Sequence, residues 1–356
     1  MNIARLLLGL FLRAARPLLR LLLKLKRPLL RALPTIARLL VSVGLIVFLI
    51  HKIDVSKIAS HLKGLVVLPL VIAAVMDFIM IVMQAWRWSV LLKARGIFIR
   101  IPNLVYYYLV SIFFSAFLPT SVGGDFARIV AVSTATERRA DAVASIVVER
   151  IMGFFVLLPL SLAAVPFVAG ELKEWRLIFI AEALGIGIIL GFLILLVKPV
   201  ARVFSRVLDP IFRLFKRFKV RGRLERVYGA IVIYRDSRGA LLKGLGLSVV
   251  SRLLWVAACY FVGRAFSLNL SLPVLLVVAP IVELVRMIPV SISGIGLREA
   301  AFAVMLAQFG VETSLGLSFG IVVYAVFFVF AILGGILYGL GSLRRARRAV
   351  PSDQVS

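Results

Sequence analysis

The chain consists of long apolar runs separated by short polar segments. Six runs are long enough for a helix, at 1.5 Å per residue, to cross most or all of a hydrocarbon core about 30 Å thick. This pattern predicts an all-α, polytopic integral membrane protein. The six predicted spans lie near 36–50, 65–90, 143–169, 177–197, 244–263 and 314–341.

Two further apolar stretches, 103–136 and 271–310, are interrupted by proline and glycine. Clusters of Lys and Arg mark the cytoplasmic segments of a membrane protein. All the basic clusters of this chain fall on the cytoplasmic side only if each of the two stretches returns to the side of the membrane from which it starts. The return arms, 126–136 and 297–310, are short for full spans. We therefore predict two re-entrant helical hairpins, although two fully spanning hairpins would preserve the same topology.

The two hairpin apices share a sequence pattern. Leu118–Arg128 and Ile288–Arg298 each have a proline, a serine two residues on, a glycine five on and an arginine nine on. Broken helices in matching positions of two halves are typical of transporters built from inverted repeats, whose binding sites lie near the bilayer midplane. The sequence thus predicts inverted halves at 65–169 and 244–341.

The polar segments complete the predicted organisation. Residues 1–33 carry eight Lys or Arg and no acid, which indicates either an amphipathic surface helix or a disordered basic anchor. A transmembrane domain follows over 34–343, with a basic cytoplasmic loop at 198–243 and a cytoplasmic tail at 344–356. With six spans, both termini are expected in the cytoplasm of a cell (inner or plasma) membrane protein.

Composition supports this class and excludes others. The chain is 62% hydrophobic with a mean hydropathy of +1.07, more apolar than a soluble protein of this length could bury. The net charge is +27, and the basic residues lie between the apolar segments. This distribution is typical of membrane topology and of contact with anionic lipid rather than of nucleic-acid binding. Cys259 and the separated His51 and His61 form no disulfide framework or metal set, so we expect no metal or cofactor.

The apices could bind an anion. A return arm that begins near mid-membrane offers free N–H groups, and serine hydroxyls with Arg128 and Arg298 would suit a phosphate. The alternative is that proline and glycine only form turns and the arginines snorkel to an interface. Alanine at Gly124 or Gly294 is expected to lower the free energy of unfolding by roughly 1 kcal/mol unless the native φ is positive. The predicted substrate-binding residues are Pro119, Ser121, Gly123, Gly124, Asp125, Arg128, Pro289, Ser291, Ser293, Gly294, Gly296, Arg298 and Glu299.

Some roles near the apices and span ends have structural alternatives. Asp125 is interpreted as an N-cap on the return arm as well as a possible ligand. Arg87, between Trp86 and Trp88, is interpreted as an anchor at the membrane interface.

Ionisable residues within the spans must pair or face water, because each is costly in hydrocarbon. Glu283 and Arg286 lie three residues apart on one helix face and could form a structural pair or serve a function. Glu149 and Arg150 point about 100° apart and must reach other helices. Arg252 is expected to meet substrate or an acid such as Asp77. The full set, predicted as a charge relay or as structural pairs, is Asp77, Glu149, Arg150, Glu182, Arg252, Glu283 and Arg286.

Enzyme activity is not expected. The sequence shows no nucleophile with a base and an orienting partner, no Gly-x-Ser-x-Gly elbow and no Walker A loop. An energy source is not evident, so downhill movement and proton coupling through Glu149 or Glu283 both remain open.

Three segments carry a family resemblance: Leu118–Arg128, Val148–Gly153 and Ile288–Glu299. They resemble the flippase-like family typified by the N-terminal membrane domain of lysylphosphatidylglycerol synthases, over about residues 35–345. The resemblance implies movement of a phospholipid between leaflets, and a separate cytoplasmic domain that makes this lipid from aminoacyl-tRNA. We find no such second domain in the 356 residues, so synthase activity is not carried over.

The expected function is translocation of an anionic phospholipid or isoprenoid-phosphate lipid. The expected partners are membrane lipids and a separate lipid-synthesising enzyme. Two rivals remain: an intramembrane enzyme that acts on a lipid head group, and a non-transporting scaffold of a lipid or glycolipid pathway.

Overall fold

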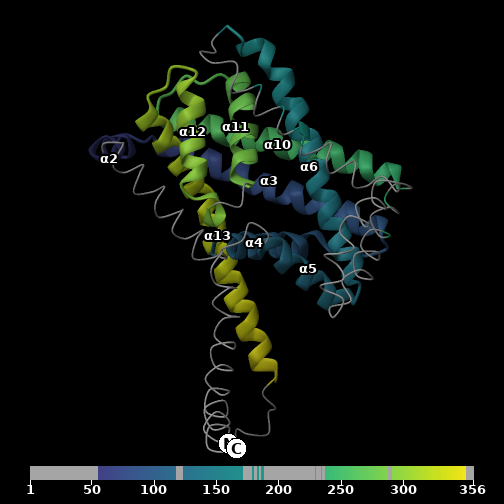
Figure 1. Ribbon diagram of the computed structural model, residues 1–356. Coiled ribbons are helices and arrows are strands. Elements are labelled where there is room, and N and C mark those ends of the chain that lie inside the picture. The colour runs from purple at the N-terminus through teal and green to yellow at the C-terminus, as the bar shows by residue number, and fades with distance from the viewer. Residues whose placement is uncertain are drawn as a thin grey trace, which may run out of the picture.

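A computed structural model describes residues 55–117, 123–170, 237–287 and 291–349, together with the single residues 179, 183, 186, 187, 229 and 234. All regular structure in this part of the chain is helical (Figure 1). The predicted segment 1–33, the span 36–50, most of the span 177–197 and most of the loop 198–243 lie outside the described residues. The elements are α2 (Val55–Lys63), α3 (Val67–Ala94), α4 (Ile101–Phe117), α5 (Gly123–Thr136), α6 (Arg139–Val168), α10 (Arg238–Ala265), α11 (Leu272–Met287), the 3₁₀ turn η3 (Ile292–Gly294), α12 (Leu297–Ala307) and α13 (Thr313–Ala349).

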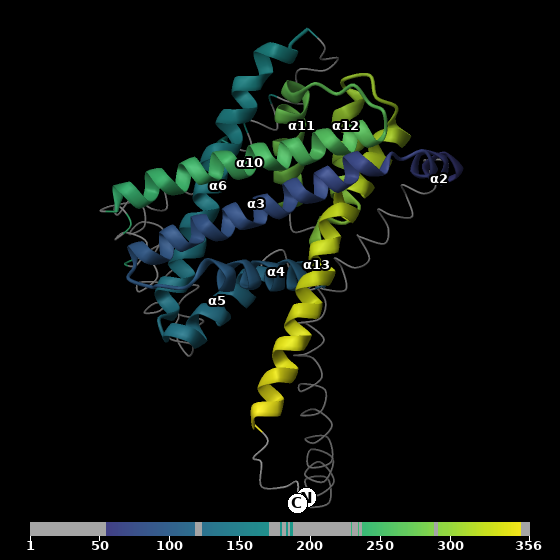
Figure 2. The ribbon, with the colours of Figure 1, turned by 180° about the vertical axis from the view of Figure 1, so that it is seen from behind.

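Four helices are long and apolar enough to cross a membrane. They correspond to the predicted spans 65–90, 143–169, 244–263 and 314–341. The helices are α3, α6, α10 and the Thr313–Gly341 part of α13. In both ribbon views α13 extends well beyond the other described helices (Figures 1 and 2).

The helices α3 and α10 pack against each other in opposite directions (Figure 2). At one end of the pair the Val66 amide, just before α3, donates to the carbonyl of Ala265 at the end of α10, over 3.1 Å. At the other end, Arg87 late in α3 donates to Ser248 early in α10, over 2.9 Å. The first long helix of each predicted half is therefore antiparallel to its counterpart.

Each predicted hairpin is present as two contacting helices, α4 with α5 and α11 with α12. Their helices have 17, 14, 16 and 11 residues, fewer than the roughly 20 that a full span needs. The hairpin α4–α5 packs on its own following helix α6, and its first arm also packs on α13 of the other half. The hairpin α11–α12 repeats this arrangement, because α12 packs on α13 and α11 packs on α6.

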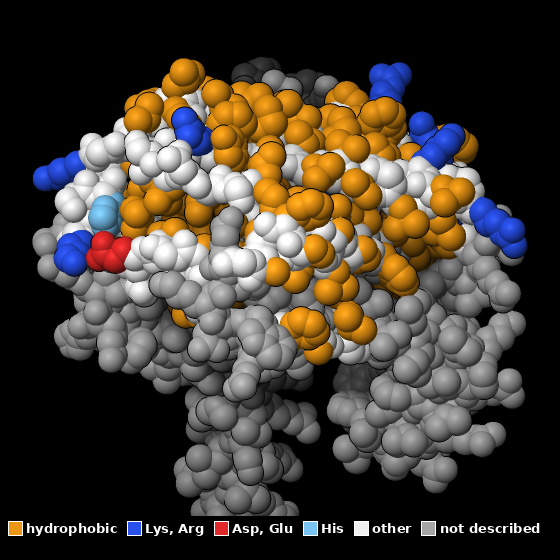
Figure 3. Space-filling model, turned by 90° about the horizontal axis from the view of Figure 1, so that it is seen from above, with side chains coloured by type: hydrophobic (Ala, Val, Ile, Leu, Met, Phe, Trp, Pro, Cys, Tyr) orange, Lys and Arg blue, Asp and Glu red, His pale blue; other side chains and the backbone are white. Residues whose placement is uncertain are grey.

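The long helices present apolar side chains outward and polar ones inward. On α3 the exposed residues Val67, Val71, Val75 and Phe78 recur at helical spacing. The space-filling view shows hydrophobic side chains over most of the described part of one face, with lysines and arginines mainly towards its edges (Figure 3). Such a surface suits contact with lipid chains, and it leaves the polar residues of the spans to face one another.

Candidate functional site

A polar cavity lies between the two predicted halves. It has two lobes of about 220 Å³ and 230 Å³, which share lining residues from α3, α4, α10, α11, η3 and α13 and therefore adjoin. Six arginines and four acids line the two lobes together. They are Arg87, Arg128, Arg150, Arg252, Arg286, Arg298, Asp77, Asp125, Glu149 and Glu283.

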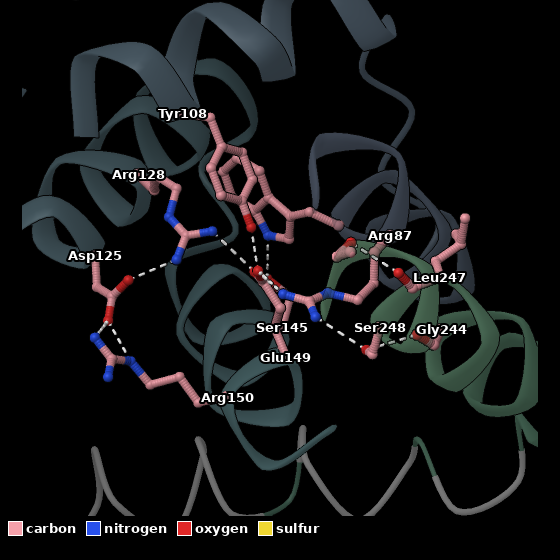
Figure 4. A network of polar contacts seen from close by, with 12 residues as sticks. Arg87, Tyr108, Asp125, Arg128, Ser145, Glu149, Arg150, Gly244, Leu247 and Ser248 are labelled. Atoms are coloured by element: carbon pink, nitrogen blue, oxygen red, sulfur yellow. Dashed lines mark hydrogen bonds and ion pairs between the residues drawn. The ribbon is translucent and has the colours of Figure 1, made fainter. Parts of the chain in front are cut away.

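Glu149 of α6 is the centre of the polar network in the first lobe (Figure 4). One carboxylate oxygen accepts hydrogen bonds from Arg87 Nη2, at 2.6 Å, and from the Tyr108 hydroxyl. The other accepts a hydrogen bond from Arg128 Nη1 at 2.8 Å. Glu149 is 4% exposed, so α3, α4 and α5 each supply a donor to one buried charge. The expectation that Glu149 reaches other helices is confirmed.

Arg128 bonds protein groups at both terminal nitrogens, while its buried Nε has no hydrogen-bond partner. Besides Glu149, it donates from Nη2 to Asp125 at 2.5 Å. Its guanidinium also lies over the Tyr108 ring, 4.3 Å from the centroid, and over Trp88 at 5.1 Å. A phosphate could bond the two terminal nitrogens as these carboxylates do only by displacing them.

Asp125 links α5 to α6 and does not act as an N-cap. It is the third residue of α5, and its second oxygen accepts a hydrogen bond from Arg150 Nε at 2.5 Å (Figure 4). The N-cap interpretation is wrong because the side chain points to Arg128 and Arg150, not back to the first amides of its own helix.

The interpretation of Arg87 as an interfacial anchor is also wrong. Arg87 is 7% exposed and bonds Glu149 and Ser248 within the bundle. The sequence contained a signal for the inward position of Arg87. Asp77, Gln84 and Arg87 are spaced by seven and three residues and therefore share one polar face of α3. The aromatic and hydroxyl partners Tyr108, Ser115, Ser248 and Tyr324 were also missed.

The second hairpin holds its charges in local pairs. Arg286 of α11 donates from Nη2 and Nε to Glu283, at 2.6 and 2.9 Å, which confirms the predicted pairing on one helix face. Arg298 of α12 pairs with Glu299 and lies over the Tyr324 ring, 3.8 Å from its centroid.

The start of α12 is occupied by the protein's own carboxylate. Glu299 accepts a hydrogen bond from the Gly296 amide at 2.7 Å, so an acid already lies where the sequence predicted an anion. Ser293 Oγ donates to the Ser115 carbonyl, which joins the second apex to the end of α4. Ser291 Oγ is buried without a hydrogen-bond partner. Pro119, Ser121 and Pro289 lie outside the described residues, and buried Gly123 begins α5.

The apex glycines are positions of close packing. A Cβ on Gly124 would lie less than 3.0 Å from Ser115 Oγ and from the Ser111 carbonyl oxygen of α4. Gly294 has a φ of +76°, and a Cβ there would lie 2.5 Å from Arg286 Cγ. The small expected loss on substitution by alanine is therefore wrong for Gly124, since the added methyl group meets atoms that must move. Gly294 has the positive φ for which that expectation did not hold.

Arg252 differs from the other cavity arginines. It lines both lobes, yet among the described residues it is the only cavity arginine for which no ion pair is formed. The predicted pairing with Asp77 is absent, and Asp77 Oδ1 has no hydrogen-bond partner.

Comparison with known proteins places this architecture in a family. The family described as "Lysylphosphatidylglycerol synthase TM region" matches residues 35–335. A protein described as "UPF0104 membrane protein", from Methanothermobacter thermautotrophicus, is 24% identical over 260 residues, which cover 68% of this chain and 76% of the relative. Because the family match spans most of the chain, the protein belongs to the lysylphosphatidylglycerol synthase transmembrane-region family of membrane proteins.

Proposed function

We propose that this protein is a lipid translocase that moves an anionic phospholipid or isoprenoid-phosphate lipid between membrane leaflets. The observation that carries the proposal is Arg252, a cavity cation without an ion pair in the described part of the chain, placed where residues of both halves meet. A head group that enters the cavity would find this charge while its chains remain in the bilayer. Membership of the family supports a role connected with membrane lipid.

The arrangement of the halves supports a transport cycle rather than a chemical step. Counterpart helices α3 and α10 run antiparallel, and the two hairpins make corresponding contacts with the opposite halves. We propose that the halves form an inverted repeat, that both hairpins re-enter from opposite sides, and that rocking of one half against the other exposes the cavity alternately. In a second state, the head group would replace a carboxylate at Arg128 or Arg298. A separate enzyme would supply the lipid.

The lipid site is tested by substitution of Arg252. We expect Arg252→Gln to reduce leaflet exchange of a fluorescent anionic lipid in reconstituted vesicles at least tenfold, a loss of about 1.4 kcal/mol of interaction. Folding should be preserved, because no ion pair is broken. The matched control is Arg264→Gln on the same helix, where the exposed arginine bonds Asn269. Normal exchange in Arg252→Gln, with the wild type active, would remove this residue from the site.

The inverted arrangement is tested by labelling. Single cysteines at Glu137, between α5 and α6, and at Val311, between α12 and α13, replace corresponding loop positions of the two halves. In a background where the buried Cys259 is replaced by alanine, a membrane-impermeant thiol reagent should label them from opposite sides. Labelling of both from one side would contradict the inverted repeat.

A further inference from the structure

Asp77 is an unusual acid for a membrane span. It is 4% exposed, it lines the second lobe of the cavity, and its Oδ1 atom has no hydrogen-bond partner. The other cavity acids, Asp125, Glu149 and Glu283, each pair with at least one arginine. Within the described residues, Asp77 is therefore the cavity carboxyl group that has no counter-charge.

The described arginines near Asp77 already form ion pairs with other acids, with one exception. Arg87, Arg286 and Arg298 line the same lobe, and each is paired with a glutamate. Arg252 also lines this lobe, and it forms no ion pair with any described residue. The titratable groups that face Asp77 across the lobe or pack near it are Arg252 and Cys259 of α10, Glu283 and Arg286 of α11, Arg298 of α12, Tyr324 of α13, and Arg87 of α3 itself.

We propose that Asp77 is a proton-binding site whose protonation is linked to anion occupancy of the second lobe. The proposal rests on the proposed function, because the anion is the lipid head group. An ionised Asp77 and an anionic head group in the same lobe repel each other. A proton taken from water, forming an O–H bond on the carboxyl group and changing no other bond, removes this repulsion.

The ion pairs favour Asp77 as the proton-binding acid over Glu149 and Glu283, the two acids for which the sequence analysis left proton coupling open. Protonation of Glu149 would leave Arg87 and Arg128 buried without their shared counter-charge, and protonation of Glu283 would do the same to Arg286. Protonation of Asp77 breaks no ion pair in the described structure. Burial without a counter-charge generally favours the neutral form of a carboxyl group.

The linkage is measured as binding against pH. Short-chain phosphatidylglycerol is titrated into purified protein between about pH 5 and pH 9, a range in which its phosphodiester keeps its charge. Where Asp77 is ionised in the empty protein, the affinity of the wild type should fall by up to tenfold per pH unit as pH rises, since one proton is bound with the lipid. Asp77→Asn, a permanent neutral mimic, should keep the acid-pH affinity at every pH. The control Glu137→Gln removes an exposed acid and should behave as wild type.

A second measurement separates this inference from the proposed function. At the acid end of this pH range, infrared spectra of the protein without lipid should contain a protonated-carboxyl C=O band that Asp77→Asn lacks. Equal pH dependence of binding in wild type and Asp77→Asn, or an unchanged C=O band, would overturn the proton site. Proton-linked binding without any leaflet exchange by the wild type would instead overturn the proposed function and leave the proton site standing.

Discussion

Replacement of Glu149 by glutamine is expected to destabilise the protein by about 3–5 kcal/mol, the usual effect of removing one partner of a buried ion pair. Glu149 forms ion pairs with both Arg87 and Arg128, whose side chains are 8% and 7% exposed. Glutamine keeps the shape of the side chain but leaves two guanidinium groups buried around an uncharged amide. We expect a lower midpoint of thermal unfolding in detergent and poor recovery as a monodisperse peak.

Two comparisons isolate the charge effect. Glu137→Gln makes the same change at an exposed site and should leave the unfolding midpoint unchanged. The double variant Glu149→Gln, Arg128→Gln removes a cation along with the acid, so its loss should be smaller than the sum of the single losses. If Glu149→Gln unfolds at the wild-type temperature, the network is not a structural requirement.

Alanine in place of Gly124 is expected to disturb the first hairpin severely, by 1–3 kcal/mol or more. The added methyl group would meet the Ser111 carbonyl oxygen, which belongs to the backbone of α4 and cannot rotate away. The helices α4 and α5 would have to separate, which would pull Asp125 and Arg128 from their partners. The measurement is again thermal unfolding, together with leaflet exchange by any protein that remains folded.

The matched control for this change is Gly246→Ala. Gly246 lies within α10, is exposed, and has no atom within 4 Å of an added Cβ, so alanine should be neutral or slightly stabilising through its higher helix propensity. Adding Ser115→Ala to Gly124→Ala removes only the contact with the hydroxyl oxygen and should restore stability in part. Full stability of the single Gly124 variant would show that α4 and α5 can separate at little cost.

The apolar runs were sufficient to predict most of the described helices. Hydropathy located α3, α6, α10 and α13, because apolar length is what a bilayer demands of a helix. Charge alternation and the repeated Pro, Ser, Gly and Arg pattern placed the two hairpins. These features are local or periodic, so a single sequence contains them.

The partners of the charged residues could not be predicted in the same way. Glu149 could be expected to leave its own helix, but the choice of Arg87, 62 residues away, depends on how α3 and α6 pack. The error at Arg87 arose because neighbouring tryptophans indicate an interface equally well. At α12, Glu299 follows Arg298 directly, and only the turn at Gly296 shows that this acid closes the helix end.

The antiparallel packing of α3 and α10 has an electrical consequence for the cavity. Each helix carries roughly half a positive charge at its start and half a negative charge at its end, and here each start lies beside the other helix's end. The two macrodipoles therefore largely cancel along the pair. This pair of helices adds little net potential to the cavity, and exchange of a carboxylate partner or a proton changes the side-chain charge there without rebuilding the helices.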